Sequence, residues 1–305
     1  MDKVLFLFAP ADAWFLELMT MYALYFDEQD DEILESPLFD FLGFAHVDNN
    51  HCFVCGSELD SQNRTDEHVF PRWLSRKYNL MNPLSSRIVI PHEKPIKYSA
   101  KLPCCYQCNQ VMGNLLEKVI HNAIAFDGAY DNAVHLSQNT WFYWANKISY
   151  GLACYENYLV GRNVKNKACA QPISEGKLLK QSFGRMLLKN LVRNGIEEEA
   201  LGSVFVFNIT DSEENFFGYK ESLNGMFEII LGKIGVLVGL HDGNCLRKKL
   251  QTEDIVKRDE LSTKDFRKLY QFCDKCLEKT INLPRYYINF DDSSGKTEYE
   301  ILPAF

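Results

Sequence analysis

The sequence Cys52-Phe-Val-Cys55 is followed by Glu67-His68-Val-Phe-Pro71 and then by Cys105-Tyr-Gln-Cys108-Asn109. Each of the two cysteine pairs has two intervening residues, which is the spacing of a closed tetrahedral zinc site. Such a site stabilises a small unit whose own core is too small to fold alone. These four cysteines are therefore predicted to bind one structural zinc ion.

Two further cysteine motifs need an interpretation. Cys104 directly precedes Cys105, but the two-residue gap to Cys108 favours Cys105 as the zinc ligand. Cys273 and Cys276 have the same spacing as the zinc pairs and fall on a predicted helix with no partner pair nearby. They are interpreted as half-buried cysteines one turn apart. For the whole motif, a zinc ribbon without an active site is the structural alternative.

The residues between and after the cysteine pairs suit phosphodiester hydrolysis. That reaction needs a base to deprotonate water and a cation to hold the phosphate. His68 offers an imidazole that is largely neutral near pH 7, and Glu67 and Asn109 offer oxygen donors. Two of these residues also have a purely structural interpretation. His68 could be an ordinary core or surface histidine, and Asn109 could cap the helix that follows it.

This arrangement resembles the HNH, or ββα-metal, endonucleases. More narrowly, it is similar to the subgroup whose ββα unit is bracketed by a zinc site, as in a phage junction-resolving endonuclease. The active site of that subgroup is an acid-His pair and an Asn after the fourth cysteine, which match Glu67, His68 and Asn109. A branch of bacterial HNH proteins adds a helical Glu, here Glu117. The resemblance covers roughly residues 50–121.

The resemblance implies a catalytic site with specific roles. Glu67 and Asn109 would bind one Mg²⁺ or Mn²⁺, His68 would be the general base, and Glu117 or His121 would add a group from the helix. Adjacent strand residues normally point to opposite faces, so the resemblance implies a distorted strand at Glu67 and His68. The sequence departs from the family in two ways. The acid is Glu where Asp is commoner, and the middle Asn of the pattern has only Asn79 and Asn82 as candidates.

Charge is distributed unevenly along the chain. The net charge is -8, but residues 1–50 contain eleven acids and one lysine, whereas residues 72–118 contain eight basic residues and two acids. Local potential, and not net charge, governs contact with phosphate. The predicted phosphate contacts are Arg72, Arg76 and Lys77 after the first strand, and Lys180, Arg185, Lys189 and Arg193 along one predicted helix.

Composition bounds the class of protein and its compartment. A hydrophobic content of 46% indicates a globular protein. Ten cysteines in a chain of this length, four of them at zinc spacing, indicate a reducing compartment. The start of the chain lacks the features of a signal peptide, and no run of about 18 apolar residues occurs, so a cytoplasmic protein without a membrane span is predicted.

The fold class predicted is α+β, in three segments. Residues 1–49 are an acidic, largely helical segment, residues 50–125 are the zinc-stapled ββα-metal unit, and residues 126–305 are a larger domain of helices and antiparallel sheet. Periodicity in this larger domain predicts helices within 138–195 and 254–279, the latter with an N-cap at Ser262 and Thr263. It also predicts strands at 204–209, 226–231, 235–240, 286–290 and 299–302.

These observations lead to one main hypothesis and one alternative. The main hypothesis is a metal-dependent endonuclease that cuts DNA, with RNA not excluded, in restriction or phage defence. Residues 126–305 would serve target recognition, homo-oligomerisation or regulation, and the acidic N-terminal segment would shield the site or bind a partner protein. The alternative is a catalytically inactive, zinc-stapled module that binds nucleic acid or another protein.

Overall fold

The structure is a computed structural model that describes residues 4–5, 50–80, 87–88, 96–125, 128–163, 175–251, 253, 257–279, 285–291 and 296–302. The helices are α3 (Arg72–Lys77), α4 (Tyr106–Met112), the π-helix η2 (Gly113–Glu117), α5 (Lys118–Ile124), α6 (Ala129–His135), α7 (Gln138–Asn163), α8 (Glu175–Asn194), α9 (Cys245–Leu250) and α10 (Thr263–Lys279). The strands are β1 (Val4–Leu5), β2 (Arg64–His68), β3 (Arg87–Ile88), β4 (Ile96–Lys97), β5 (Lys101–Cys105), β6 (Val204–Ile209), β7 (Phe217–Glu221), β8 (Met226–Leu231), β9 (Ile234–Gly239), β10 (Glu260–Leu261), β11 (Arg285–Asp291) and β12 (Lys296–Leu302).

Strands β2 and β5 lie between the cysteine pairs, with α3, β3 and β4 in the connection between them, and a helix follows β5. Strands β2 and β5 pair antiparallel, with Glu67 opposite Leu102 and His68 opposite Lys101. The chain leaves β5 directly into α4, which continues through η2 and α5. Strand β2 alternates between an inner face, which carries Thr65 and Glu67, and an outer face that includes His68. The predicted ββα order of elements is therefore present.

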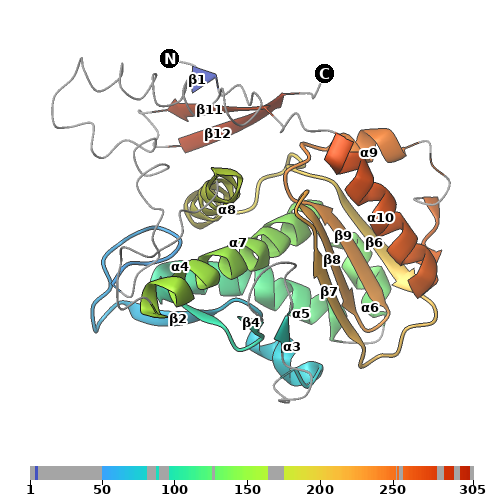
Figure 1. Cartoon of the computed structure of the whole chain (residues 1–305), viewed down its shortest axis with the longest axis horizontal. Helices are drawn as coiled ribbons and strands as arrows, with labels where there is room; N and C mark the ends of the chain where they lie inside the picture. The colour runs from blue at the N-terminus through green and yellow to red at the C-terminus, as the bar shows by residue number, and fades with distance from the viewer. Residues whose placement is uncertain are drawn as a thin grey trace.

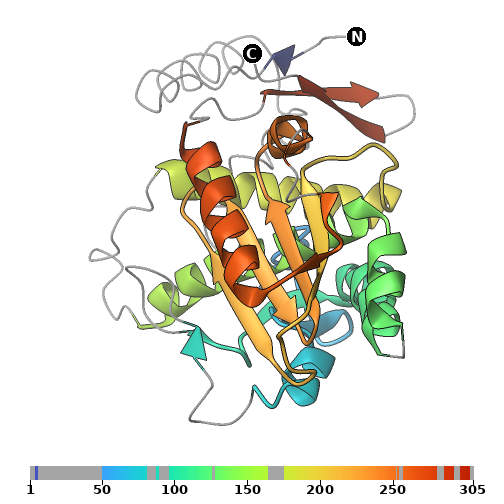
Figure 2. The same ribbon diagram turned by 90° about the vertical axis from the view of Figure 1, so that its right-hand side faces the viewer.

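A five-stranded sheet forms the second half of the core, in the order β10-β6-β9-β8-β7. Every residue of β8 and β9 is buried, which matches their nearly continuous apolar sequences. Gly232 turns the chain between them with a φ of 66°, and a Cβ there would lie 2.8 Å from the Glu214 carbonyl oxygen. Helix α10 covers one face of this sheet, as Figure 2 shows.

Helix α7 connects the two halves. It contacts η2 and β5 on one side and β6 and β9 on the other, and it runs from the ββα unit to the five-stranded sheet (Figure 1). Its segment from Trp141 to Ile148 is apolar on nearly every side and fully buried, as expected for a helix inside a core. One hydrophobic cluster accordingly extends from Cys52 to Leu240. The division of the chain at residues 125 and 126 stays a prediction.

Most of the predicted elements are present, and the α+β prediction is confirmed. Helix α10 begins as expected, because the Ser262 hydroxyl oxygen accepts a hydrogen bond from the Asp265 backbone N–H at 3.2 Å. Strands β11 and β12 form the predicted C-terminal pair. Helices α3, α6 and α9 and strands β4, β7 and β10 were not predicted.

Only two residues of the N-terminal segment are described. Val4 and Leu5 form strand β1, which pairs antiparallel with β11, and the prediction of a largely helical segment stays a prediction. The rest of the segment 1–49 lies outside the described residues, as does the predicted turn at 292–295. Among the helices that the structure describes, none combines the length and apolar character needed to span a membrane.

Candidate metal centre and active site

The four predicted zinc ligands come together in the structure. We call Cys52, Cys55, Cys105 and Cys108 the sulfur cluster. Their Sγ atoms lie within 4.8 Å of one another, and the Sγ atoms of Cys55 and Cys105 are 3.8 Å apart. A Zn–S bond of about 2.3 Å gives a tetrahedron with edges of about 3.8 Å. The cluster therefore fits a structural metal ion such as zinc.

Local backbone geometry places these thiols. After the first pair, Gly56 adopts a φ of 80° and donates its N–H to the Cys52 carbonyl oxygen at 2.9 Å, which closes the turn. At the second pair, Cys105 is the N-cap of α4, and its sulfur accepts the Cys108 N–H at 3.5 Å. The transition from β5 to α4 thus brings Cys105 and Cys108 to one side of the chain.

Two helices from the later part of the chain support the first knuckle. The Tyr150 hydroxyl on α7 donates to the Phe53 carbonyl oxygen at 2.7 Å, and the Arg185 Nε on α8 donates to the Val54 carbonyl oxygen at 2.9 Å. Arg185 was expected to contact phosphate from an exposed helix face. That expectation is wrong, because its side chain is buried against this knuckle with 6% exposure.

The other cysteines of the described residues lie outside the sulfur cluster. Cys104 is fully buried, and its Sγ is 3.9 Å from that of Cys52. It is not one of the four cysteines whose Sγ atoms all lie within 4.8 Å of one another. The four thiols that the structure brings together thus include Cys105 and not Cys104. Cys273 and Cys276 are buried in the core between α10 and the sheet, where they pack against apolar side chains.

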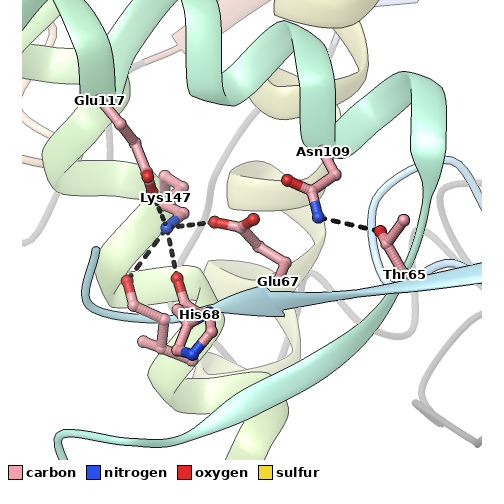
Figure 3. Close-up of polar contacts among 7 residues, drawn as sticks. Thr65, Glu67, His68, Asn109, Glu117 and Lys147 are labelled. Carbon is pink, nitrogen blue, oxygen red and sulfur yellow. Dashed lines mark hydrogen bonds and ion pairs between the residues drawn. The ribbon is translucent and has the colours of Figure 1, made fainter. Parts of the chain in front are cut away.

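A second cluster of donor atoms lies beside β2, and we call it the oxygen cluster. It consists of the Glu67 and Glu117 carboxylates and the backbone carbonyls of His68 and Val69. All four surround the ammonium group of Lys147 (Figure 3). The Lys147 Nζ is 2.5 Å from Glu67 Oε1, 2.7 Å from Glu117 Oε1, 2.6 Å from the His68 oxygen and 3.2 Å from the Val69 oxygen.

Three elements bring this cluster together. Glu67 points inward from β2, and Glu117 is the last residue of η2. A π-turn inserts one residue into a helix and changes the direction of the side chains that follow, and such turns occur often at functional sites. Lys147 reaches the cluster from α7, which lies very close to β2. At Gly151, one turn further along, a Cβ would lie 3.2 Å from the Val69 side chain.

The oxygen cluster is charged and almost fully buried from solvent. The side chains of Lys147 and Glu67 are 1% and 7% exposed, and that of Glu117 is 20% exposed. Burial raises the pKa of the Glu67 carboxyl, and the Lys147 ammonium opposes this change. Burial alone would lower the pKa of Lys147, but the two carboxylates raise it above its ordinary value. Lys147 is therefore the resident cation of the oxygen cluster.

His68 does not share the site with Glu67. Figure 3 shows the Glu67 carboxylate on the helix side of β2 and the His68 imidazole on the opposite side. Strand pairing is regular through His68 and Lys101, so the implied distortion of the strand is absent and normal alternation separates the two side chains. Burial and the nearby positive charges of Lys101 and Arg72 lower the pKa of His68 to about 4, which leaves it neutral at pH 7.

Asn109 lies on the inner side, near Glu67. Its Nδ2 donates to the Thr65 hydroxyl at 2.9 Å, and that hydroxyl donates to the Cys104 carbonyl oxygen at 2.9 Å. Asn109 does not cap α4, because Cys105 is the N-cap. The structure thus brings Asn109, Glu67 and Glu117 to the space between β2 and the following helix (Figure 3).

The remaining candidates have other positions. The His121 ring packs against Trp73, with ring centroids 5.0 Å apart. Asn79 follows α3 with a φ of 51° in a turn, and Asn82 lies outside the described residues.

The predicted basic surface is only partly present. Arg72, Arg76 and Lys77 are exposed on α3, and Lys77 Nζ also donates to the Ile124 carbonyl oxygen at 2.9 Å. On α8, Lys189 is half-buried and Arg193 is exposed, while the side chain of Lys180 lies outside the described part of the chain. Of the predicted phosphate contacts, those of α3 are therefore the exposed ones that lie within the ββα region of the chain.

The oxygen cluster also provides a test for the predicted catalytic ion. Carboxylate and carbonyl oxygens are the donors that Mg²⁺ prefers, and here they converge on one point. Mg²⁺ binds oxygen at about 2.0–2.1 Å, a shorter distance than the contacts of the ammonium. The donor set therefore fits a hard divalent cation, provided that Lys147 leaves the position it holds.

Lys147 was not predicted as a site residue. A signal was present, because it is a single charge within the apolar run Trp141-Phe-Tyr-Trp-Ala-Asn-Lys-Ile148. Lysine is almost never fully buried unless it is paired, so a lysine in such a helix indicates a buried acidic partner. What the sequence did not contain was the identity of that partner, 80 residues earlier in the chain.

Comparisons of this chain with models of protein families, with curated proteins and with solved structures gave no match.

Proposed function

We propose that this protein is a metal-dependent endonuclease of the HNH type that hydrolyses phosphodiester bonds in DNA. The observation that carries the proposal is the convergence of Glu67 and Glu117 on one cation position inside a ββα unit closed by four cysteines. A strand between two zinc knuckles and a helix after the second supply these carboxylates. Asn109 lies on the same side of the unit.

The outer face of β2 supplies the groups that would act on the phosphate. His68 is neutral at pH 7, so it can accept a proton from the attacking water. Arg72 and Lys101 are exposed and close enough to lower its pKa, and their charges favour a phosphate group beside it. Proton acceptance and phosphate binding are thus combined on one exposed face.

The inner face would hold the ion. Glu67, Glu117 and Asn109 are the residues that would bind Mg²⁺ or Mn²⁺, and an ion there stabilises negative charge on a phosphate oxygen. Glu67 and His68 point to opposite sides of β2. For both to act on one phosphate, substrate binding must change the conformation of the end of β2 so that both side chains reach the phosphate. We assign the activity to restriction or phage defence in the cytoplasm on the resemblance of the motif layout, with residues 126–305 contributing recognition or assembly.

A second candidate function has its own support. The Lys147 ammonium holds the position of the cation, and His68 faces away from Glu67. Both features suit a zinc-stapled module that binds nucleic acid or a partner protein without cutting. In that case the exposed cations Arg72, Arg76 and Lys77 would contact phosphate groups. Each contact would add about 0.9 to the magnitude of the slope of log K against log salt concentration for duplex DNA.

Cleavage of supercoiled plasmid decides between the two functions. The zinc-loaded full chain is incubated with plasmid in Mg²⁺ or Mn²⁺, with and without EDTA. We expect nicking that needs the added ion, and a loss of about 10²–10⁴ in rate for His68→Ala, since a general base contributes that much. The matched control is His135→Ala, an exposed histidine on α6. Nicking by His68→Ala at the wild-type rate would exclude His68 as the base, and binding without any nicking would favour the second candidate.

A further inference from the structure

Lys147 is a fully buried cation that the chemistry proposed above does not use. Its side chain extends from α7 into the ββα unit, where the ammonium touches two carboxylate and two carbonyl oxygens. These oxygens come from three places: the end of β2, the residue that follows it, and the last turn of η2. A cation bound in this way is not available to a substrate, because the side chain is 1% exposed.

An ammonium group and a divalent ion exclude each other at this position. Both would use the Oε1 atoms of Glu67 and Glu117, which lie only 2.5 and 2.7 Å from Nζ. A metal ion about 2.0–2.1 Å from the same two oxygens would place a second cation in direct contact with the atoms that hold the ammonium. The position can therefore hold the ammonium or the ion, but not both.

We propose that Lys147 competes with a divalent metal ion for Glu67 and Glu117. The apparent affinity of the ion is then reduced by the fraction of molecules in which the ammonium has left the cluster. The ion concerned is the one that the proposed nuclease would use, and in that respect the inference rests on the proposed function. The competition itself concerns binding, and it is measured without a nucleic acid.

The charge balance of the cluster agrees with such a competition. When both carboxyls are ionised, two carboxylates and one ammonium leave one negative charge uncompensated, so the cluster then retains an attraction for cations. Removal of the ammonium adds a second negative charge and frees both Oε1 atoms. Affinity for a hard divalent ion increases with the number of charged oxygen ligands.

Binding of Mn²⁺ to the zinc-loaded full chain tests the proposal. Free Mn²⁺ is followed by electron paramagnetic resonance during titration of the wild type, Lys147→Met and Lys147→Met/Glu117→Gln. We expect Lys147→Met to lower the apparent Kd by at least about tenfold, as for a site that is free in no more than a tenth of wild-type molecules. The double variant should lose this gain. The matched control, Lys118→Met, removes an exposed charge from the residue next to Glu117 and should leave the Kd unchanged.

A measurement on the wild type keeps the test decisive if Lys147→Met does not fold. The buried ammonium gives a slowly exchanging signal in NMR spectra selective for lysine NH₃⁺ groups. Competition predicts that this signal changes in step with occupancy as Mg²⁺ is added. The proposal is overturned if Mg²⁺ saturates the protein and the signal stays, if no Mg²⁺ binds at any concentration, or if folded Lys147→Met binds Mn²⁺ no more tightly than the wild type.

The two proposals fail separately. If Lys147→Met gains affinity for Mn²⁺ but no variant nicks plasmid, the nuclease function is wrong and the competition stands. If the wild type nicks plasmid and Lys147→Met shows no gain in affinity, the competition is wrong and the nuclease function stands.

Discussion

The sulfur cluster and the oxygen cluster both place four donor atoms around one point, but they differ in where the positive charge comes from. Four thiols form the sulfur cluster, and together they suit a metal ion. In the oxygen cluster, by contrast, Lys147 from a distant helix supplies the cation. The first cluster thus needs an ion from outside, whereas the second is neutralised largely from within.

This difference has a consequence for how each cluster contributes to the fold. The sulfur cluster joins a loop to the start of α4, so the free energy of metal binding there is free energy of folding. The oxygen cluster joins α7 to the ββα unit without any ion, and a metal ion could enter only by displacing that link. A metal ion therefore stabilises the first region and competes with the structure of the second.

The largest effect is expected at the sulfur cluster. Cys55→Ser should lose the bound zinc and unfold the region around residues 50–64, because the remaining three thiols cannot complete a closed tetrahedral site. Zinc content by elemental analysis and thermal unfolding by circular dichroism would measure this. Cys245→Ser, at a half-buried cysteine outside the cluster, is the control and should keep its zinc. A folded Cys55→Ser protein with full zinc content would show that the cluster is not the zinc site.

A smaller loss of stability is expected at the oxygen cluster. Lys147→Met should reduce the free energy of unfolding by about 3–5 kcal/mol at neutral pH, since removal of one partner leaves buried charge uncompensated. Added Mn²⁺ should restore part of the loss, because an ion that binds only the folded state stabilises it. Denaturant unfolding with and without Mn²⁺ measures both effects, with Lys118→Met as the control. Equal stability of Lys147→Met and the wild type would mean that the ion pairs do not hold α7 in place.

The smallest effect concerns a buried carboxyl in the sheet, which forms no ion pair with an ammonium of the described residues. Glu228 on β8 is 5% exposed, and its Oε2 has no hydrogen-bond partner among the described residues. Burial raises its pKa to about 6, although Lys220 and Arg267 oppose this. The folded state therefore favours the protonated form, and ionisation of Glu228 lowers stability as the pH rises from about 4.5 to above 6.

Glu228→Gln should remove this penalty. The free energy of unfolding should increase by about 1–2 kcal/mol at pH 8, since one pKa unit corresponds to about 1.4 kcal/mol. Below about pH 4.5 the gain should disappear, because Glu228 is then protonated in both states. Denaturant midpoints across this pH range would measure the change. A gain that is equally large at pH 4 and pH 8 would show that packing, and not ionisation, causes it.

The parts of the fold that could be predicted from sequence are those that depend on local pattern. The C-x-x-C spacing identified the four thiols, and the continuous apolar runs of β6, β8 and β9 identified buried strands. Strand β7 was missed because Phe217-Gly-Tyr-Lys-Glu221 is half-buried and contains a glycine, so it has neither a continuous run nor clear alternation.

The parts of the site that could not be predicted depend on contacts between distant residues. Arg185 looked like one of several basic residues on a helix face, but burial depends on what packs against that face, and here the turn at Cys52–Cys55 does. Lys147 and Glu67 are 80 residues apart, and only the close approach of α7 to Val69 brings them together. Sequence can indicate that a buried charge needs a partner, whereas the fold determines which partner it finds.

The most direct test of this account is the metal content of the purified wild-type protein, measured by elemental analysis after extensive dialysis against buffer with a low concentration of Mg²⁺. The account predicts one zinc ion per chain at the sulfur cluster and no second tightly held divalent ion, because Lys147 occupies the oxygen cluster. A folded protein without zinc would contradict the assignment of the sulfur cluster. A second divalent ion that remains after dialysis and is lost in Glu67→Gln would contradict the assignment of Lys147 as the resident cation.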